Sequence, residues 1–194
     1  MGQTGNVSNS TRWLVYAVIV LGGAIVFSSV NAIVTRERTE RAARTCAANM
    51  FHLDRAMQMY LADYDDAFPL ASSWCDVVVP YTEARPPFNC PAAQNQRFSF
   101  AYNAAVAGRR RAEIQNLQEV VLLFESDAGW NAAGGPELLP EEPRHFGGDR
   151  VTRANFSSSW MSRASRERDR RKEWLREYRG LIWTPILQGG DGGR

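Results

Sequence analysis

The chain has 194 residues, of which 44% are hydrophobic and 23% are charged, and its formal net charge is +2. This length suits one domain of ordinary size with an appended element. The charged fraction excludes a wholly disordered chain, and the small net charge excludes one that is basic from end to end. The three cysteines, Cys46, Cys75 and Cys90, are too few for a disulfide scaffold, and their spacing does not match a zinc motif.

Residues 13–34 form an apolar segment of 22 residues without a charge. A helix of this length, at about 1.5 Å per residue, reaches roughly 33 Å, which is enough to cross the hydrocarbon core of a bilayer. Trp13 and Tyr16 near its start fit the aromatic belt of a membrane interface. The segment is too long for the core of a signal peptide, and a buried helix of a soluble protein is the alternative. We expect a membrane anchor.

Small residues in this segment would let another helix approach closely. They are also simply tolerated in spanning helices, so both interpretations stay open. The expected packing residues are Gly22, Gly23, Ser28 and Ser29.

The arginines around the segment bear on its orientation. Arg12 precedes the segment, whereas Arg36, Arg38, Arg41 and Arg44 follow it closely. Counted alone, this distribution places the C-terminal part in the cytoplasm.

No helix breaker occurs between Val34 and the Phe68-Pro69 pair. Beyond the apolar segment, large apolar side chains recur every three or four residues, which predicts a helix with one apolar face. We therefore predict one helix over residues 13–64, roughly 78 Å long, whose second half lies against a sheet. The recurring residues are Cys46, Met50, Leu53, Met57, Tyr60 and Tyr64.

Residues 65–143 contain many prolines, which indicates loops and short strands. Residues 97–102 alternate as a half-buried strand does, whereas residues 119–124 predict a strand buried on both faces. Residues 151–156 give a weaker third strand. The predicted fold class is α+β, with a long helix packed on a small antiparallel sheet.

The charge differs between segments. Residues 45–143 carry 6 arginines and 13 acids, a net of −7, whereas residues 144–179 carry 11 cations and 5 acids, a net of +6. Residues 163–179 predict an exposed basic helix, which could meet anionic lipid, nucleic acid or an acidic protein face. Acids at helical spacing within it favour the acidic protein face over nucleic acid. The expected docking residues are Arg163, Arg166, Arg170, Arg171 and Trp174.

Six short motifs follow one another between residues 44 and 103. They are Arg-Thr-Cys-Ala-Ala-Asn at 44–49, Tyr-Leu-Ala-Asp-Tyr-Asp-Asp-Ala-Phe-Pro at 60–69, Trp74, Pro80-Tyr81, Phe-Asn-Cys-Pro at 88–91 and Phe-Ser-Phe-Ala-Tyr-Asn at 98–103. In content and order they resemble the prepilin-type H-x9-DG proteins, relatives of pilins and type II secretion pseudopilins.

The resemblance implies a pilin-like fold and a non-enzymatic subunit or accessory protein of a pilus or secretion-type assembly. Its partners would be other membrane or pilin-like subunits. Pilin-type proteins also carry cations just after their membrane helix and still expose the domain outside the cytoplasm. We therefore expect a single-pass protein of the bacterial inner (cytoplasmic) membrane with an extracytoplasmic C-terminal domain.

The chain departs from the family at its N-terminus. Pilin-type precursors carry a Gly-Phe-Thr-Leu-Ile-Glu start, with cleavage after the glycine. Counting back from Cys46 places Ser10, Thr11 and Val15 where the glycine, the phenylalanine and the glutamate would fall. We expect that prepilin peptidase does not process this chain.

The motif that names the family is also altered. Arg144-His145 with Gly147-Gly148 matches its opening, but Asn155-Phe156 stands where the Asp-Gly pair would be. Because phenylalanine does not favour the positive φ of such a turn, we expect the turn to be rebuilt. His145 is expected to be a structural histidine rather than a ligand or catalyst.

No catalytic motif stands out in the sequence. Asp63, Asp65 and Asp66 offer oxygen ligands for calcium, as do Glu125 and Asp127, but they lack the spacing of a calcium loop. An acidic helix end is commonly only solvated. We therefore expect no cofactor, with calcium as the one candidate.

Cys46 and Cys90 both lie in the family-like motifs. A disulfide between them is consequently expected outside the cytoplasm, with Cys75 left over. Three reduced, buried thiols are the alternative.

The expected organisation is a cytoplasmic stub over residues 1–12, a transmembrane helix over 13–34, a pilin-like domain over 35–160, and a basic helix with a Gly-rich tail over 161–194. One alternative function is a membrane-anchored, extracytoplasmic binding module that does not enter a filament. A more distant one is a membrane-tethered hydrolase that uses His145.

Overall fold

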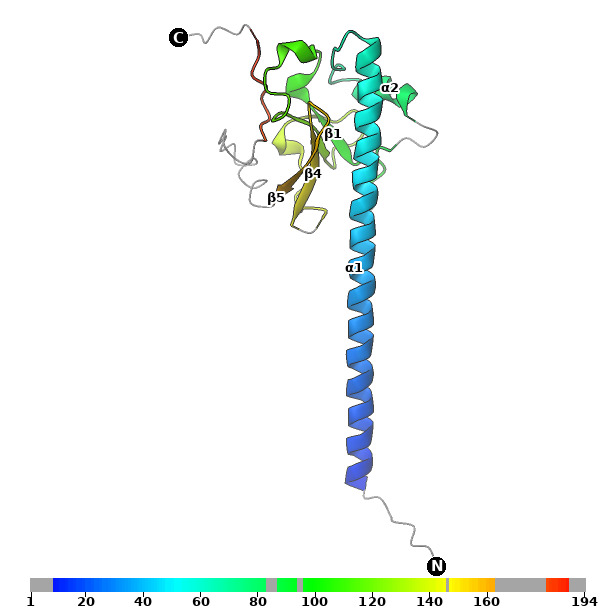
Figure 1. Ribbon diagram of the computed structural model, residues 1–194. Helices are drawn as coiled ribbons and strands as arrows, with labels where there is room; N and C mark the ends of the chain where they lie inside the picture. Colours follow the sequence, from blue (N-terminus) through cyan, green and yellow to red (C-terminus); the bar gives the residue numbers. More distant parts are fainter. Residues whose placement is uncertain (1–8, 83–86, 94–95, 146, 163–180, 189–194) are drawn as a thin grey trace, which may run out of the picture. The chain divides into compact units, whose positions relative to one another are not determined.

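The computed structural model describes residues 9–82, 87–93, 96–145, 147–162 and 181–188 (Figure 1). The chain divides into two compact units, Met1–Glu40 and Arg41–Arg194. The long helix α1, Asn9–Asp63, runs from the first unit into the second. The predicted single helix over residues 13–64 is therefore confirmed.

The first unit is the N-terminal part of α1. Between Arg12 and Asp63 the helix contains an 18-residue window of mean hydropathy 2.3, none of which is buried. Apolar side chains face outward all round, as Trp13 and Phe27 do with 74% and 70% of their surface exposed. By length and composition this helix can cross a membrane, although a signal sequence has the same properties.

The predicted packing residues lie on this exposed part of α1. A Cβ added at Gly22 or Gly23 meets no atom within 4 Å. The Ser29 hydroxyl donates to the Ile25 carbonyl 2.8 Å away, so its hydrogen bond is made within the helix. Ser28 is exposed as well. This surface is open to another helix.

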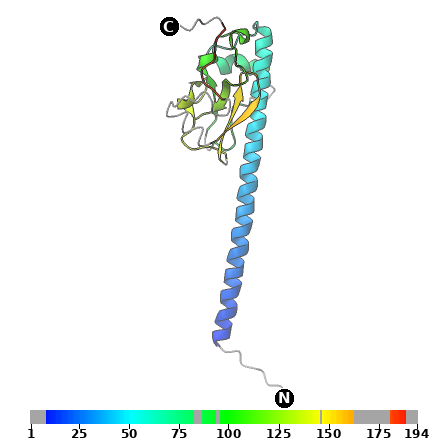
Figure 2. The same cartoon turned by 60° about the vertical axis from the view of Figure 1, so that its left-hand side comes forward.

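The second unit is an α+β body, in which the C-terminal half of α1 lies along a sheet (Figures 1 and 2). One face of this half is buried as predicted, although Tyr64 lies just past the helix end with 53% of its surface exposed. Asp65 and Asp66 have φ values of 53° and 58°, which reverse the chain after the helix. The buried large residues of the apolar face are Cys46, Met50, Leu53, Met57 and Tyr60.

The sheet has five strands in the order β3-β1-β2-β4-β5. Their bounds are β1 Phe100–Asn103, β2 Val121–Glu125, β3 Ala133–Gly134, β4 Gly148–Arg153 and β5 Ser158–Ser162. A short helix α2, Trp74–Val78, follows α1, and 3-10 turns occur at Val79–Tyr81, Ala104–Val106, Arg111–Glu113 and Pro136–Leu138.

The α+β class is confirmed, but the sheet is mixed rather than antiparallel. β3 pairs with β1 in parallel, whereas the other neighbours are antiparallel. β1 and β2 run in opposite directions. The chain reverses once after β2, so β3, which pairs with the free edge of β1, runs in the same direction as β1. A two-residue strand leaves no hydrophobic pattern that could have predicted this pairing.

The central strands are buried on both faces. β2 is buried over its whole length, as the apolar run predicted. β1 is also fully buried, so the half-buried strand expected over residues 97–102 is wrong. Ala101 of β1 packs in a second core cluster with Trp183 and Leu139, on the face away from α1. That face is covered by segments that follow much later in the sequence.

A β-bulge decides which residues of β2 face α1. The register with β4 shifts between Val121 and Phe124, with one more residue on β2 than on β4. Leu122 and Leu123 consequently both pack in the core cluster that contains α1, whereas Val121 and Phe124 pack in the second cluster. Alternation then resumes and turns Glu125 toward α1.

The predicted third strand is β4, which forms a hairpin with β5. Contrary to expectation, Phe156 itself adopts the positive φ, 65°, in the connecting turn. Its N–H donates to the Arg153 carbonyl 2.7 Å away, and the Asn155 carboxamide accepts the Ser157 N–H. The Arg111 guanidinium lies 5.5 Å from the centre of the Phe156 ring. These contacts offset the strain of a bulky residue at this position.

Residues 181–188 pack on the α+β body, although they follow residue 160, where we expect the pilin-like domain to end. Ile182 exchanges backbone hydrogen bonds with Glu119 and Val121, and Trp183 is buried. The Asn103 carboxamide donates to the Trp183 carbonyl 2.8 Å away. The predicted basic helix lies outside the described residues, as do the docking residues Arg163, Arg166, Arg170, Arg171 and Trp174.

Candidate metal centre

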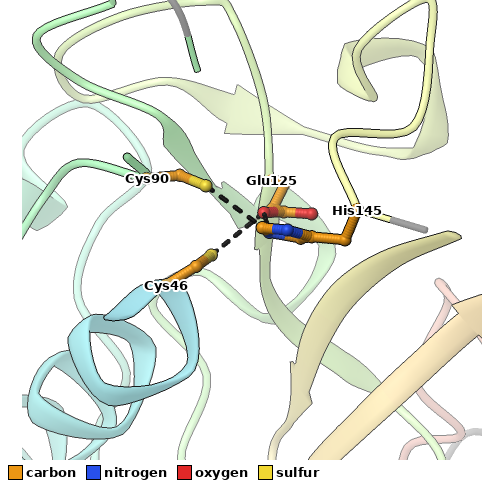
Figure 3. A group of neighbouring side chains, drawn as sticks. All are labelled: Cys46, Cys90, Glu125 and His145. Carbon is orange, nitrogen blue, oxygen red and sulfur yellow. Dashed lines mark hydrogen bonds and ion pairs between the residues drawn. The ribbon is translucent and has the colours of Figure 1, made fainter. Parts of the chain in front are cut away.

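Four buried side chains from separate segments meet in the α+β body (Figure 3). Cys46 comes from α1, Cys90 from the loop before β1, Glu125 from the end of β2 and His145 from the loop before β4. One potential ligand atom of each residue lies within 4.8 Å of all the others. All four residues are buried, and the most exposed of them, His145, has only 4% of its surface accessible to solvent.

The Cys90 loop is held in place by backbone hydrogen bonds. The Asn49 carboxamide on α1 donates to the Asn89 carbonyl 2.7 Å away, which ties the loop to the helix one turn after Cys46. The Ala93 N–H donates to the Cys90 carbonyl at 2.9 Å, and the Ala92 N–H hydrogen-bonds to the Cys90 sulfur. This turn directs the sulfur inward.

Glu125 and His145 are oriented by β4. The Arg150 N–H donates to Glu125 Oε2 at 3.0 Å, so Oε1 is left to face the cluster. His145 and Gly148 exchange two backbone hydrogen bonds of 3.3 and 3.2 Å, with Gly147 at φ +82° between them. The imidazole is thereby fixed above the end of β2.

The short contacts among the four side chains meet at one point and do not form the proton relay of a catalytic triad. Glu125 Oε1 lies 2.8 Å from His145 Nε2, and the Cys46 thiol donates to the same oxygen at 3.0 Å. The Cys90 sulfur lies 3.5 Å from the same Nε2. In a catalytic triad, the nucleophile and the carboxylate use opposite nitrogens of the histidine. Here both use Nε2, and Nδ1 has no hydrogen-bond partner among the described residues.

The pKa shifts in the cluster favour negative charge on Cys90 and Glu125 and disfavour it on Cys46. The interaction with Cys46 lowers the pKa of Cys90 to about 6, whereas the interaction with Cys90 and burial raise the pKa of Cys46. Burial alone would raise the pKa of Glu125, but the hydrogen bond and charge of His145 hold it below its ordinary value. Burial opposes protonation of His145, yet hydrogen bonds to Cys90 and Glu125 raise its pKa to about 9.

The structure brings the predicted disulfide partners together but does not join them. Cys46 and Cys90 are free thiols within one cluster, and Cys75 is a third buried thiol elsewhere. The Cys75 sulfur accepts the Asn131 N–H at 3.3 Å. All three cysteines are thus buried free thiols in this structure, and the Cys46–Cys90 disulfide stays a prediction.

The predicted calcium ligands do not come together. Asp63 accepts a hydrogen bond from the Tyr81 hydroxyl at 2.7 Å, Asp65 lies 3.9 Å from Arg110, and Asp66 lies 3.5 Å from Arg111. Each carboxylate has a different partner, and none belongs to the one ligand group found in the described residues. Asp127 pairs with Arg144, whereas Glu125 is part of the cluster.

The sequence did not reveal this centre. Cys46, Cys90 and His145 each lie in a family-like motif, and Glu125 stood out only as an oxygen ligand. Zinc motifs are recognised by close pairs of ligands, whereas these four ligands come from four distant segments. The presence of two cysteines and a histidine in the motifs that resemble the family was the sequence signal that could have indicated the cluster.

The centre is separate from the surface hollow that the structure shows. A shallow hollow of about 380 Å³ is lined by Ala92, Ala93, Gln96, Asp127, Pro140, Glu141, Glu142 and Arg144. None of the four clustered residues lines it. Their arrangement is that of a closed binding site.

Comparison with protein-family models, with curated proteins and with solved structures gives no match to this chain. The function of the chain is therefore inferred from its own residues and contacts.

Proposed function

We propose that this chain is a single-pass, membrane-anchored, pilin-like subunit or accessory protein of a pilus or secretion-type assembly. The anchor lies in the bacterial inner membrane and the α+β body lies outside the cytoplasm. The observation that carries this proposal is the continuity of α1, which is exposed and apolar at one end and packed on a sheet at the other.

The exposed apolar surface supports an anchor. A helix that is apolar on all sides is stable only inside a protein or a membrane, and none of the apolar window is buried. The chain before Arg36 contains only one charged side chain, Arg12. A bilayer supplies the burial that this helix needs.

Assembly through the same helix is supported by its small residues. Gly22 and Gly23 leave open space on the helix surface, so a neighbouring helix can approach closely there. Three aromatic residues of the motifs that resemble pilin-type proteins also contact one another. Trp74, Phe88 and Tyr102 pack together, with ring centres 5.8 and 5.7 Å from Trp74.

A non-enzymatic role is supported by the burial of the titratable cluster. His145 is 4% exposed and does not line the surface hollow. A catalytic histidine must reach the proton that it transfers. This geometry does not favour a hydrolase that uses His145.

A second candidate is a membrane-anchored extracytoplasmic binding module that does not enter a filament. Val15 favours it, because the resemblance to pilin-type proteins places an acidic residue there that helps assembly. Such a module keeps the same anchor and body but forms no helix bundle with other subunits.

Co-purification separates the two candidates. A tagged full-length chain is extracted in detergent, and the proteins that accompany it are identified by mass spectrometry, together with those of sheared surface filaments. We expect other single-pass subunits with pilin-like helices. Recovery of the chain without such subunits would favour the binding module.

A pair of variants tests the helix contact. Gly23→Leu fills space that is empty in the isolated chain, so the chain itself should fold normally while co-purification falls at least several-fold. Val26→Leu, a change between exposed apolar residues in the same segment, is the matched control and should retain its partners. Equal yields of partners from both variants would contradict packing through Gly23.

A further inference from the structure

We propose that Cys46, Cys90, Glu125 and His145 bind one Zn²⁺ ion in a closed, structural site. This proposal is independent of membrane assembly, because all four ligands lie in the α+β body. The ion would tie α1 to the loops before β1 and β4 and to the end of β2.

The distances fit a tetrahedral ion. Zinc lies about 2.3 Å from thiolate sulfur and about 2.0–2.2 Å from imidazole nitrogen or carboxylate oxygen, so tetrahedral ligand atoms are roughly 3.3–3.8 Å apart. The measured contacts are 2.8, 3.0 and 3.5 Å, and all four ligand atoms lie within 4.8 Å. Small side-chain movements around the common centre would place every atom at bonding distance from one ion.

The donor set selects zinc among the common ions. Two sulfurs, one imidazole nitrogen and one carboxylate oxygen suit a borderline-soft metal. Calcium and magnesium bind through oxygen, which here comes from Glu125 alone. Four protein ligands leave no open position for a substrate, which is the pattern of structural rather than catalytic zinc.

The surrounding hydrogen bonds are those that hold metal ligands in place. The Arg150 N–H fixes Glu125 Oε2, and the Ala92 N–H hydrogen-bonds to the Cys90 sulfur. Groups of this kind orient the ligands and raise metal affinity. Without an ion, the body buries two thiols, a carboxylate and an imidazole, and burial of such polar groups is costly.

The binding step is balanced in protons and charge. Two protons pass to solvent as the ion binds: the thiol proton of Cys46 and the proton that Cys90 and His145 share, so both sulfurs bind as thiolates and His145 binds as the neutral imidazole through Nε2. With two thiolates and one carboxylate, the bound site carries a net charge of −1. Zinc binding should therefore weaken as the pH falls.

The first measurement is the metal content of the full-length wild-type chain, purified in detergent without reductant or chelator. We expect about one zinc per chain by elemental mass spectrometry. Co²⁺ added to chelator-stripped protein should give the thiolate-to-metal charge-transfer absorption of a tetrahedral sulfur site. If the stripped chain takes up neither Zn²⁺ nor Co²⁺, the proposal is wrong.

A thiol count separates zinc from a disulfide. In denaturant with chelator and no reductant, a zinc site releases all three cysteines as reactive thiols, whereas a Cys46–Cys90 disulfide leaves only Cys75. We expect three thiols, and a count of one would overturn the proposal. This test uses wild-type protein, so it does not depend on the folding of a variant.

Variants identify the ligands. Glu125→Gln keeps the shape of the side chain and both sulfurs but removes the anionic ligand, so zinc affinity should fall by at least 10–100-fold while the charge-transfer band persists. Cys90→Ser removes one of the two thiolates and should lower that band by about half. Cys75→Ser, a buried cysteine outside the cluster, is the matched control and should keep both affinity and band. Zinc loss in Cys75→Ser equal to that in Cys90→Ser would contradict the assignment.

Discussion

Asp54 is a buried acid on the face of α1 that packs against the sheet. Its residue is 3% exposed, and Oδ1 has no hydrogen-bond partner among the described residues. Burial raises its pKa from 3.8 to about 7, against the opposing hydrogen bond of Thr152. A carboxyl group in this position is most stable when it is protonated.

The sign of its pH dependence follows from linkage. Between pH 3.8 and about 7 the folded chain holds a proton that the unfolded chain has lost. The contribution of Asp54 to stability is therefore complete below pH 3.8 and is lost as the pH rises through about 7, by roughly 4 kcal/mol in all. Asp54→Asn is neutral at every pH and should remove this decline. Denaturant unfolding at pH 5 and pH 8 measures the fall in the free energy of unfolding. An equal fall in the wild type and in Asp54→Asn would contradict the raised pKa of Asp54.

Arg144 holds the ends of β1 and β2 together. Its guanidinium donates to the Ser99 and Ser126 carbonyls at 2.7 and 2.6 Å and pairs with Asp127. Ser99 and Ser126 are buried, so removing the guanidinium leaves their carbonyls without this partner.

Arg144→Met should therefore lower the free energy of unfolding by about 2–4 kcal/mol. Arg150→Met is the control, because Arg150 is half-buried and its guanidinium lies 5.9 Å from the Trp160 ring. That contact is worth only about 0.5–1 kcal/mol. Denaturant unfolding compares the two, and equal losses would show that the Arg144 contacts contribute little.

Two adjacent glycines have different roles in the element that carries His145. A Cβ at Gly148 would lie 2.1 Å from the Met161 carbonyl oxygen on β5, whereas a Cβ at Gly147 meets nothing within 4 Å. Gly147 instead has a φ of +82°, which side chains disfavour. Gly147 is therefore required by its backbone conformation, and Gly148 by the close approach of β4 and β5.

Gly148→Ala should consequently separate β4 from β5 and displace His145, at a cost of about 2–3 kcal/mol or more. Gly147→Ala should cost only about 1–2 kcal/mol. Thermal unfolding gives the ranking, and backbone amide exchange in β5 locates the damage. A larger loss in Gly147→Ala than in Gly148→Ala would contradict the close approach.

The elements with strong local signals could be predicted from the sequence. The regular recurrence from Cys46 to Tyr60 identified the buried face of α1, and the unbroken apolar run identified β2. The two-residue β3 and the packing of residues 181–188 could not be predicted, because they depend on partners that are distant in the sequence. The cluster of Cys46, Cys90, Glu125 and His145 could not be predicted for the same reason, even though three of its members lie in motifs that resemble the family.

At the scale of the whole molecule, the net charge of +2 is the sum of segments with very different charges. An uncharged apolar segment is followed by residues 45–143 with a net of −7 and residues 144–179 with a net of +6. The helix α1 joins the apolar segment to the body without a break. A helix that is long and apolar enough to cross a membrane therefore continues into the folded body.

Protease access to the C-terminal end shows whether the α+β body lies outside the cytoplasm on a membrane anchor. The full-length chain with a C-terminal epitope is expressed in bacteria, and protease is added to intact spheroplasts and to lysed ones. We expect loss of the epitope in intact spheroplasts and retention of the chain in carbonate-washed membranes. An epitope that resists protease until lysis, or a chain released by carbonate, would contradict it.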